Sequence, residues 1–323
     1  MIKHAIETQK PILDMLKKSR DNGRLSHAYL FNGLEGSERM GVALYFACML
    51  YCKDVCLECK ECKDIINNNH LNVMVIDKLP GKSEIIKDQI ESLKDELSKT
   101  GLKDGPRIYI INDAEDMNLT CANKLLKFIE EPYDDIYAIL LTTNKDAIIQ
   151  TIRSRCQVIN LLPPNKEEIK EKLIAEGINN NDALILSNLY SSIPSCKEVL
   201  ENEAFVKSLK YTKTILEMIS KGFPNTTLYM KNEVDYFSSK ENIELFLKIM
   251  LLYFIEAKKK NSLIFVNDVE MFNKIKINLT PIIDLIVKSQ FNLRYNIDRA
   301  LLLINLFIEI DRRVIDASNK NTI

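Results

Sequence analysis

Short runs of apolar residues recur through the first half of the chain, and stretches with helical spacing separate them. The apolar runs are His27–Asn32, Asn72–Asp77, Arg107–Asn112, Tyr137–Thr143 and Cys156–Leu161. The middle runs are almost wholly apolar, as is typical of parallel strands that are buried on both faces. Helical spacing marks Ser83–Thr100, Asn118–Glu130 and Lys145–Ser154. Because strands alternate with helices, the pattern predicts a layered α/β domain with a parallel sheet.

The pattern changes at Pro163-Pro164, beyond which we find no convincing strand. A proline disfavours helical geometry in the residue before it, so a double proline is typical of a linker. We therefore predict an α/β domain over residues 1–163, a small helical domain over 164–208, and longer amphipathic helices over 209–323. The long helices are Glu241–Lys259, Pro281–Gln290 and Asn296–Asp316, the last with Asn296 and Asp298 as candidate caps.

Composition and charge restrict the function classes. The 323 residues include 44 basic and 45 acidic side chains, a net charge of -1, and 46% are hydrophobic. That balance is typical of a globular protein with a core, and it excludes nucleic-acid binding driven by bulk positive charge, although it leaves room for a local basic patch. No apolar run approaches the roughly 20 residues of a membrane-spanning helix, and the N-terminus lacks the apolar core of a signal peptide. We therefore expect a cytoplasmic protein with reduced thiols and no membrane partner.

Four closely spaced thiols form the strongest chemical motif. They are Cys52, Cys56, Cys59 and Cys62. Thiolate is a good zinc ligand, and structural zinc takes four ligands in a tetrahedron. The residues between the cysteines are mostly polar, so bound metal would have to supply the folding free energy of the loop. We predict a closed, structural zinc module over about residues 48–62, with Cys48 as a rival to Cys52 for the fourth ligand; free thiols or a redox pair are the alternatives.

A glycine-containing turn follows the first predicted strand and precedes a helix, where a phosphate-binding loop belongs. Its key residues are Gly33, Gly36, Glu38, Arg39 and Met40. In the working pattern G-x-x-x-x-G-K-[ST], the second glycine, the lysine and the hydroxyl serve phosphate and magnesium. Here Glu38, Arg39 and Met40 stand at those three positions. A carboxylate repels phosphate and a thioether offers magnesium no hard oxygen, so we predict a degenerate nucleotide site without ATP hydrolysis or tight ATP binding; an unrelated turn is the alternative.

The remaining polar candidates are weaker. Asn112-Asp113-Ala114-Glu115 follows a strand, the layout of a magnesium-holding strand end, but the position nearest the strand is an amide, which weakens metal affinity further. The histidines, His4, His27 and His70, show no ligand spacing, and the last two are expected to be hydrogen-bonded beside strands. The scattered Cys121, Cys156 and Cys196 are expected to be packing residues.

Several segments together resemble the clamp-loader ATPases of bacterial DNA polymerase III. They are Arg24–Phe31, Asn69-His70, Asn123–Pro132, Leu141–Asn144 and Thr151–Gln157, with the cysteine cluster in its place between them. The resemblance spans residues 1–163 and is weaker beyond, although Asn296–Leu303 is similar to the last helix of that family. The first cysteine spacing is shorter than the family usually shows, which is why Cys48 and Cys52 both stay candidates.

The resemblance implies an AAA+ fold, with a RecA-like P-loop-type α/β domain carrying a zinc-binding insertion, a small helical lid, and a helical collar that packs five subunits into an open ring. It also implies that Ser154-Arg155-Cys156 carries an arginine finger, Arg155, that reaches the ATP site of the neighbouring motor subunit. A permanently charged, forked guanidinium suits that task; a surface salt bridge is the alternative. Arg153 is expected to be structural, and Thr143 and Asn144 to be a retained phosphate-sensor scaffold.

Within that family, the degenerate loop and the chain length favour the ring's non-hydrolysing stator subunit over the gamma/tau motor. The implied partners are gamma/tau and delta subunits in a heteropentamer, with the sliding clamp and primer-template DNA touched indirectly, as part of a DNA-directed DNA polymerase holoenzyme. The rivals are an active motor ATPase, which Glu38, Arg39 and Met40 oppose, and a stand-alone zinc-binding nucleic-acid module, which the near-neutral charge opposes.

Overall fold

A computed structural model describes most of the chain. The described residues are 1–79, 85, 105–130, 135–222, 225–231, 237, 239–260, 262–293, 295 and 298–320. They divide into two compact units, Met1–Asn165 and Lys166–Ile323, with the division close to the predicted linker at Pro163-Pro164. Apart from Ile85, the helix predicted over Ser83–Thr100 lies outside the described residues.

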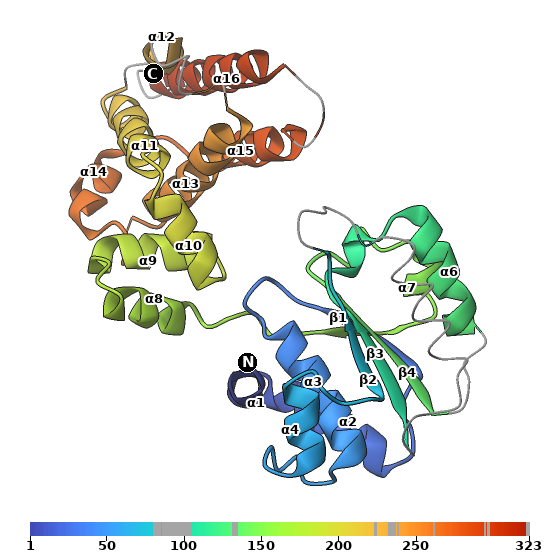
Figure 1. Ribbon diagram of the computed structural model, residues 1–323. Coiled ribbons are helices and arrows are strands. Elements are labelled where there is room, and N and C mark those ends of the chain that lie inside the picture. The colour runs from blue at the N-terminus through green and yellow to red at the C-terminus, as the bar shows by residue number, and fades with distance from the viewer. Residues whose placement is uncertain are drawn as a thin grey trace. The chain divides into compact units, whose positions relative to one another are not determined.

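The first unit is a parallel sheet between two layers of helices (Figure 1). In chain order its elements are α1 (Ile2–Thr8), α2 (Lys10–Asp21), β1 (Ala28–Asn32), α3 (Arg39–Tyr51), α4 (Lys60–Ile66), β2 (Val73–Ile76), β3 (Arg107–Ile111), the 3₁₀ turn η1 (Ala114–Asp116), α6 (Leu119–Glu130), β4 (Ile136–Thr142), α7 (Gln150–Arg153) and β5 (Gln157–Asn160). All five predicted strands are confirmed. The sheet order is β2-β3-β4-β1-β5, and every pairing is parallel.

Both faces of the sheet are buried, because alternate residues of each strand enter different cores. Tyr29 and Phe31 of β1 pack in one core with α1, α2, α3 and α4. Ala28 and Leu30 of the same strand pack in the other core with α6 and α7. This double burial is the physical reason that the strands are continuous apolar runs in the sequence. The first unit is therefore the layered α/β domain with a parallel sheet that the sequence predicts.

One helix of this unit is shorter than predicted. The sequence predicts a helix over Lys145–Ser154, whereas α7 covers only Gln150–Arg153. The side chain of Asn144 accepts a hydrogen bond from the N–H of Asp146, and its carbonyl accepts one from Ala147. Asparagine side chains that bind backbone in this way compete with helix formation, so the segment after β4 begins as a turn.

The described residues of the second unit form helices and the segments that connect them, without a strand. Its elements are α8 (Lys166–Ala175), α9 (Asn180–Leu189), α10 (Ile193–Leu200), α11 (Ala204–Ser220), α12 (Thr226–Lys231), α13 (Lys240–Lys259), the 3₁₀ turn η3 (Val266–Asp268), α14 (Val269–Lys274), α15 (Thr280–Asn292) and α16 (Arg299–Lys320). The three predicted long helices are confirmed as α13, α15 and α16. The predicted domain boundary at residues 208/209 lies within α11.

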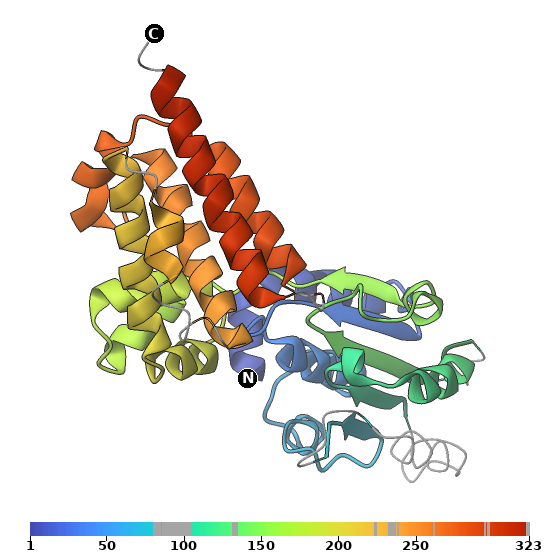
Figure 2. The same ribbon diagram turned by 90° about the horizontal axis from the view of Figure 1, so that it is seen from above.

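Helix α13 is the centre of this unit. It contacts α11, α14 and α15, and side chains on several of its faces are buried. Figure 2 shows α15 and α16 side by side, and the two helices contact each other. Asp298 accepts a hydrogen bond from the N–H of Leu301 at 2.9 Å, which confirms its predicted capping role. Within the described residues, none of the helices combines the length and apolar character that a membrane crossing requires.

Candidate functional site

Polar side chains gather where the parallel strands end. Asn32, Asp77, Asn112 and Thr142 all lie at or directly after the carboxyl ends of strands β1 to β4. Parallel strands bring these ends to one edge of the sheet, the usual place for ligands in open α/β folds. Asn32 Nδ2 donates to Asn160 Oδ1 at the end of β5 (2.9 Å), and Asn32 Oδ1 accepts from the N–H of Lys145 (3.1 Å). These bonds tie the ends of three adjacent strands together.

The predicted phosphate loop occupies the expected place between β1 and α3. Gly36 has a φ of 79°, a conformation that favours glycine, and Glu38 has a φ of 59° at the N-cap of α3. The Glu38 side chain does not cap the helix; its Oε1 lies 3.0 Å from Nδ1 of His4 on α1. Glu38, at the position of the second glycine, therefore contacts α1, whereas a glycine would leave the loop backbone accessible to phosphate.

The interior of the loop is closely packed. A Cβ added at Gly33 would lie 2.3 Å from Ser37 Oγ and 3.0 Å from Leu161 Cβ, so no larger residue fits there. Ser37 is 1% exposed, and its Oγ has no hydrogen-bond partner among the described residues. At Gly41, in the first turns of α3, an added Cβ would lie 2.8 Å from Ala5 Cβ of α1. The glycines here permit close contact within the loop and between α1 and α3.

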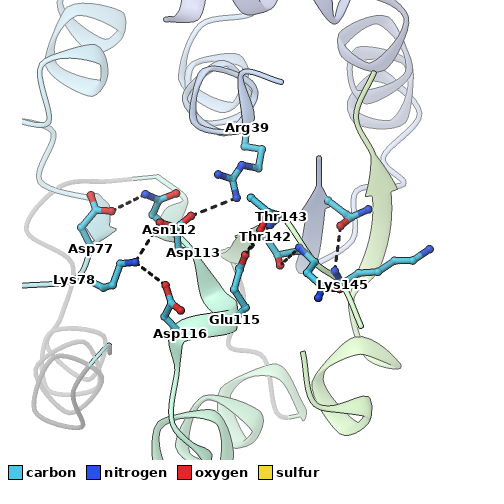
Figure 3. Close-up of polar contacts among 12 residues, drawn as sticks. Arg39, Asp77, Lys78, Asn112, Asp113, Glu115, Asp116, Thr142, Thr143 and Lys145 are labelled. Atoms are coloured by element: carbon cyan, nitrogen blue, oxygen red, sulfur yellow. Dashed lines mark hydrogen bonds and ion pairs between the residues drawn. The ribbon is translucent and has the colours of Figure 1, made fainter. Parts of the chain in front are cut away.

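Acidic side chains that follow β3 bind the basic side chains around them (Figure 3). Arg39, which takes the place of the phosphate-loop lysine, has Nη1 3.3 Å from Asp113 Oδ1. Lys78 Nζ lies 2.6 Å from Asp116 Oδ2 and 3.8 Å from Asp113 Oδ2. Asn112 Nδ2 donates to Asp77 Oδ1 at 2.8 Å. The Asp113 carboxylate thus lies between two cations.

Glu115 makes a second acidic contact at this edge. Its Oε1 accepts hydrogen bonds from both the N–H (2.8 Å) and the hydroxyl (2.6 Å) of Thr143, directly after β4. Its Oε2 is buried and has no hydrogen-bond partner among the described residues. Burial raises the pKa of this carboxyl, but the hydrogen bonds from Thr143 and from its own N–H outweigh burial, and the net pKa is lowered. Glu115 is therefore ionised at neutral pH.

Arg155 lies directly beyond α7, at the surface. Its Nη2 is 2.8 Å from Oε1 of Glu130, the last residue of α6, and its Nη1 donates to the carbonyl of Thr151 at 3.0 Å. The side chains of both members of the ion pair are 40% exposed. Surface ion pairs contribute only about 0–1 kcal/mol, so this contact leaves the guanidinium available to another partner.

Arg153 is placed differently. Its Nη1 donates to Asp146 Oδ1 at 2.6 Å and to the carbonyl of Lys145 at 3.2 Å. These bonds hold the turn that precedes α7, as expected for a structural residue.

The four predicted metal ligands come together at the end of α3 and the start of α4. The Sγ atoms of Cys52, Cys56, Cys59 and Cys62 all lie within 4.8 Å of one another. Tetrahedral zinc with Zn–S bonds of about 2.3 Å requires sulfur–sulfur distances of about 3.8 Å, and Cys52 and Cys56 are 3.7 Å apart. These residues can hold one metal ion.

The thiols differ in environment. Backbone N–H groups of Glu58 and Cys59 donate to the Cys56 sulfur and lower its pKa to about 7, which favours the thiolate. Cys48 is fully buried in the core, and burial raises its pKa to about 11. Cys48 is not one of the four mutually close thiols.

Two bulky residues of the cysteine loop have unfavourable backbone conformations. Val55 has a φ of 49° and Leu57 a φ of 61°. A positive φ is unfavourable for bulky residues and above all for β-branched ones, so such geometry persists only where its surroundings impose it. A metal bound to the flanking cysteines would impose it.

Two histidines have the hydrogen-bonded roles that the sequence predicts. The ring of His70 accepts from the N–H of Asn72 at Nδ1, so Nε2 carries the proton that binds Glu61 Oε2 (2.9 Å). This bond joins α4, which carries Cys62, to the segment before β2. His27 Nε2 lies 3.0 Å from the carbonyl of Ile129.

Sequence reasoning missed the Thr143–Glu115 contact and one further clamp. Gln9 is 1% exposed; its Nε2 donates to the carbonyl of Leu162 (2.9 Å), and its Oε1 accepts from the N–H of the same residue (2.9 Å). The clamp fixes the chain that leaves β5 just before the double proline. No local signal marks either contact, because the partners are far apart in sequence.

Comparisons with known proteins place the fold and the site in a family. Residues 8–165 match the family described as DNA polymerase III, delta subunit. The delta-prime subunit of DNA polymerase III from Bacillus subtilis is 31% identical over 253 residues, 77% of this chain and 76% of that protein. The chain belongs to the delta-prime subunits of DNA polymerase III. The resemblance to the clamp-loader family of bacterial DNA polymerase III is thus confirmed, at the level of the delta-prime subunit.

The chain is also similar to DNA polymerase III subunits of other names. The tau subunit from Bacillus subtilis is 32% identical over 154 residues, which is 46% of this chain and 27% of that protein. Among solved structures, a DNA polymerase III gamma subunit-related protein from Thermotoga maritima matches 94% of this chain and 99% of its own, with 20% identity and a TM-score of 0.39. The family assignment rests on the sequence relatives.

Proposed function

We propose that this delta-prime chain is the non-hydrolysing ring subunit of a clamp loader and supplies Arg155 to the ATP site of a neighbouring gamma/tau subunit. Its partners would be gamma/tau and delta subunits in a heteropentamer that loads the sliding clamp onto primer-template DNA, in the cytoplasm. Relatives named as gamma and tau subunits of the same polymerase support such partners.

The observation that carries the proposal is the difference in exposure and bonding between two arginines, Arg39 and Arg155. Arg39, in the nucleotide loop, is 14% exposed in its side chain and bound to Asp113. Arg155, outside the loop, is 40% exposed and held only by a surface ion pair and one carbonyl. The first is occupied within the chain, whereas the second can leave Glu130 for a phosphate on another subunit at little cost.

The arrangement opposes the rival function, an active gamma/tau-type ATPase. Glu38 adds a negative charge where phosphates would approach, and Met40 offers magnesium a thioether instead of a hydroxyl. The Asp113 carboxylate is already engaged by Arg39 and Lys78. We therefore expect no ATPase activity from the chain alone.

The proposed role for the cysteines is structural. Cys52, Cys56, Cys59 and Cys62 would hold one zinc ion, which with four thiolates has no open position for a substrate. The sulfur spacing and the strained Val55 and Leu57 support this assignment. The ion would stabilise the link between α3 and α4.

The deciding experiment removes the guanidinium of Arg155 from the whole complex. In clamp loader reconstituted with gamma/tau and delta, Arg155→Ala should leave assembly intact by gel filtration. It should also lower DNA-stimulated ATP hydrolysis at the adjacent site by about tenfold or more. This expected loss is smaller than the rate effect of arginine fingers that are supplied in trans to GTPases. Arg155→Lys should recover little, because an ammonium lacks the fork.

Arg153→Ala is the matched control, since it removes a neighbouring arginine that binds Asp146 instead. It should leave the ATPase of the complex close to that of the parent. Full ATPase in the Arg155→Ala complex would refute the finger, and ATP turnover by the purified chain alone would refute the non-hydrolysing role.

A further inference from the structure

Two carboxylates from the segment after β3 occupy groups that would face phosphate in a working nucleotide site. Arg39 stands where the phosphate-loop lysine would bind phosphate oxygens, and it binds Asp113 at 3.3 Å. Thr143 stands after β4, where a polar side chain would sense the terminal phosphate, and it gives two hydrogen bonds to Glu115. Figure 3 shows both contacts at the same edge of the sheet.

Both donors of Thr143 are used in its contact with Glu115. Thr143 has one N–H and one hydroxyl proton, and both go to the same oxygen, Oε1 of Glu115. An entering phosphate oxygen could use them only by displacing a carboxylate that is itself negatively charged. Nη1 of Arg39 is buried and has no hydrogen-bond partner among the described residues beyond its ion pair with Asp113.

Stabilisation of the segment after β3 does not by itself explain why Asp113 binds Arg39 and Glu115 binds Thr143. Asp116, in the same segment, binds Lys78 at 2.6 Å, and among the described residues neither of the two makes a hydrogen bond or ion pair with the phosphate loop or with Thr143. Glu115 and Asp113, by contrast, reach across to β4 and to the first turn of α3 respectively. Asp113 and Glu115 are thus the acids that bind Arg39 and Thr143, the two groups that would face phosphate.

We propose that Asp113 and Glu115 are an autoinhibitory contact, in which the chain's own carboxylates take the place of the phosphates of a nucleoside triphosphate. The inference rests on the proposed non-hydrolysing function and deepens it, because it names the residues that keep the nucleotide out. It implies that the site is latent: once the two charges are removed, Arg39 and Thr143 become available to a triphosphate.

The test is a gain of binding in the full-length chain. The amide variant Asp113→Asn with Glu115→Gln keeps size and shape while it removes both charges. The probes are a fluorescent ATP analogue and inorganic tripolyphosphate, titrated into parent and variant. We expect the variant to bind both probes at least about tenfold more tightly than the parent, since two like charges near the polyanion are gone. Each single variant should give a smaller gain, which keeps the test usable if the double variant does not fold.

Two further variants identify the cause. Asp116→Asn removes a charge from the same turn and should leave probe binding at the parent level. Adding Arg39→Met to the double variant should abolish the gain, because the freed cation is then missing. An unchanged affinity in a folded double variant, or a gain that survives Arg39→Met, would overturn the inference while leaving the proposed function intact. Turnover of ATP by the parent would instead defeat the proposed function.

Discussion

Glutamates of this protein show how a residue's role depends on what surrounds it. Glu38 pairs with His4, Glu130 with Arg155, and Glu115 with the backbone and hydroxyl of Thr143. Glu38 contacts helix α1. Glu130 pairs with Arg155, the surface arginine that we propose reaches the ATP site of the neighbouring subunit. Glu115 accepts hydrogen bonds at the carboxyl edge of the sheet. Because the residue type is the same, the role of each glutamate is decided by the groups that it contacts.

The lowered pKa of Glu115 predicts how stability depends on pH. A carboxyl whose pKa is lower in the folded state than in the unfolded one stabilises the fold above its unfolded pKa of about 4.5. That contribution disappears as the pH falls through the folded pKa. Glu115→Gln should therefore cost about 1.5–3 kcal/mol of unfolding free energy at pH 7, the range for hydrogen bonds to a charged group.

The same substitution should cost progressively less as the pH falls below the unfolded pKa of about 4.5, because the parent carboxyl then takes up a proton on unfolding. Urea denaturation at several pH values, followed by circular dichroism, measures the difference between parent and variant. A difference that stays constant from pH 7 to pH 3.5 would contradict the assignment.

At the scale of elements, α12 shows that a short helix can depend on another helix. It has six residues, too few to be stable alone in water. Asp311 of α16 binds its first turn: Oδ1 accepts from the N–H (2.9 Å) and hydroxyl (2.7 Å) of Thr226, and Oδ2 accepts from the N–H (3.1 Å) and hydroxyl (2.7 Å) of Thr227. A carboxylate at a helix N-terminus also complements the helix dipole.

Removing this carboxylate should therefore release α12. We expect Asp311→Ala to lower the unfolding free energy of the C-terminal unit by about 2–3 kcal/mol, the upper range for charge-assisted hydrogen bonds and caps. Asp316→Ala, an exposed aspartate on the same helix, should cost less than about 0.5 kcal/mol. Equal effects of the two substitutions in urea denaturation would show that the cap contributes nothing.

At the scale of the whole molecule, the cores are separate. The buried residues of Met1–Asn165 form one cluster on each face of the sheet, and the second unit has a cluster of its own. Units with their own cores can unfold independently. We expect two transitions in scanning calorimetry of the full chain.

Only one of these transitions should respond to metal removal, because all four clustered thiols belong to the first unit. A chelator should lower that midpoint by about 6–12 °C if the metal contributes about 3 kcal/mol. Cys56→Ser should have the same effect without chelator and should reduce bound zinc from one equivalent, whereas Cys196→Ser, in the other unit, should retain the zinc. A chelator-insensitive first transition would refute the structural metal.

The sequence by itself determined the elements and the local motifs. Five strands are predicted correctly because burial on both faces makes them continuously apolar, and the cysteine quartet is found together because metal ligands depend on spacing along the chain. The degenerate loop stays a prediction that rests on the spacing of its residues. Asp298 was identified as a cap because a cap bonds residues only a few positions away. The turn after β4 was predicted as helix, since the propensity of Lys145–Ile149 does not reveal that Asn144 binds the backbone there.

Only the tertiary structure decided which side chains meet. Thr143 and Glu115 are 28 residues apart, and Gln9 and Leu162 are 153 apart. Arg39 meets Asp113 because β3, β4 and β1 lie side by side in an order that differs from their order in the chain. Sequence periodicity reports which face of an element is buried, but not which elements become neighbours. The contacts of Arg39 and Thr143 with Asp113 and Glu115 therefore follow from the sheet order and cannot be read from the sequence.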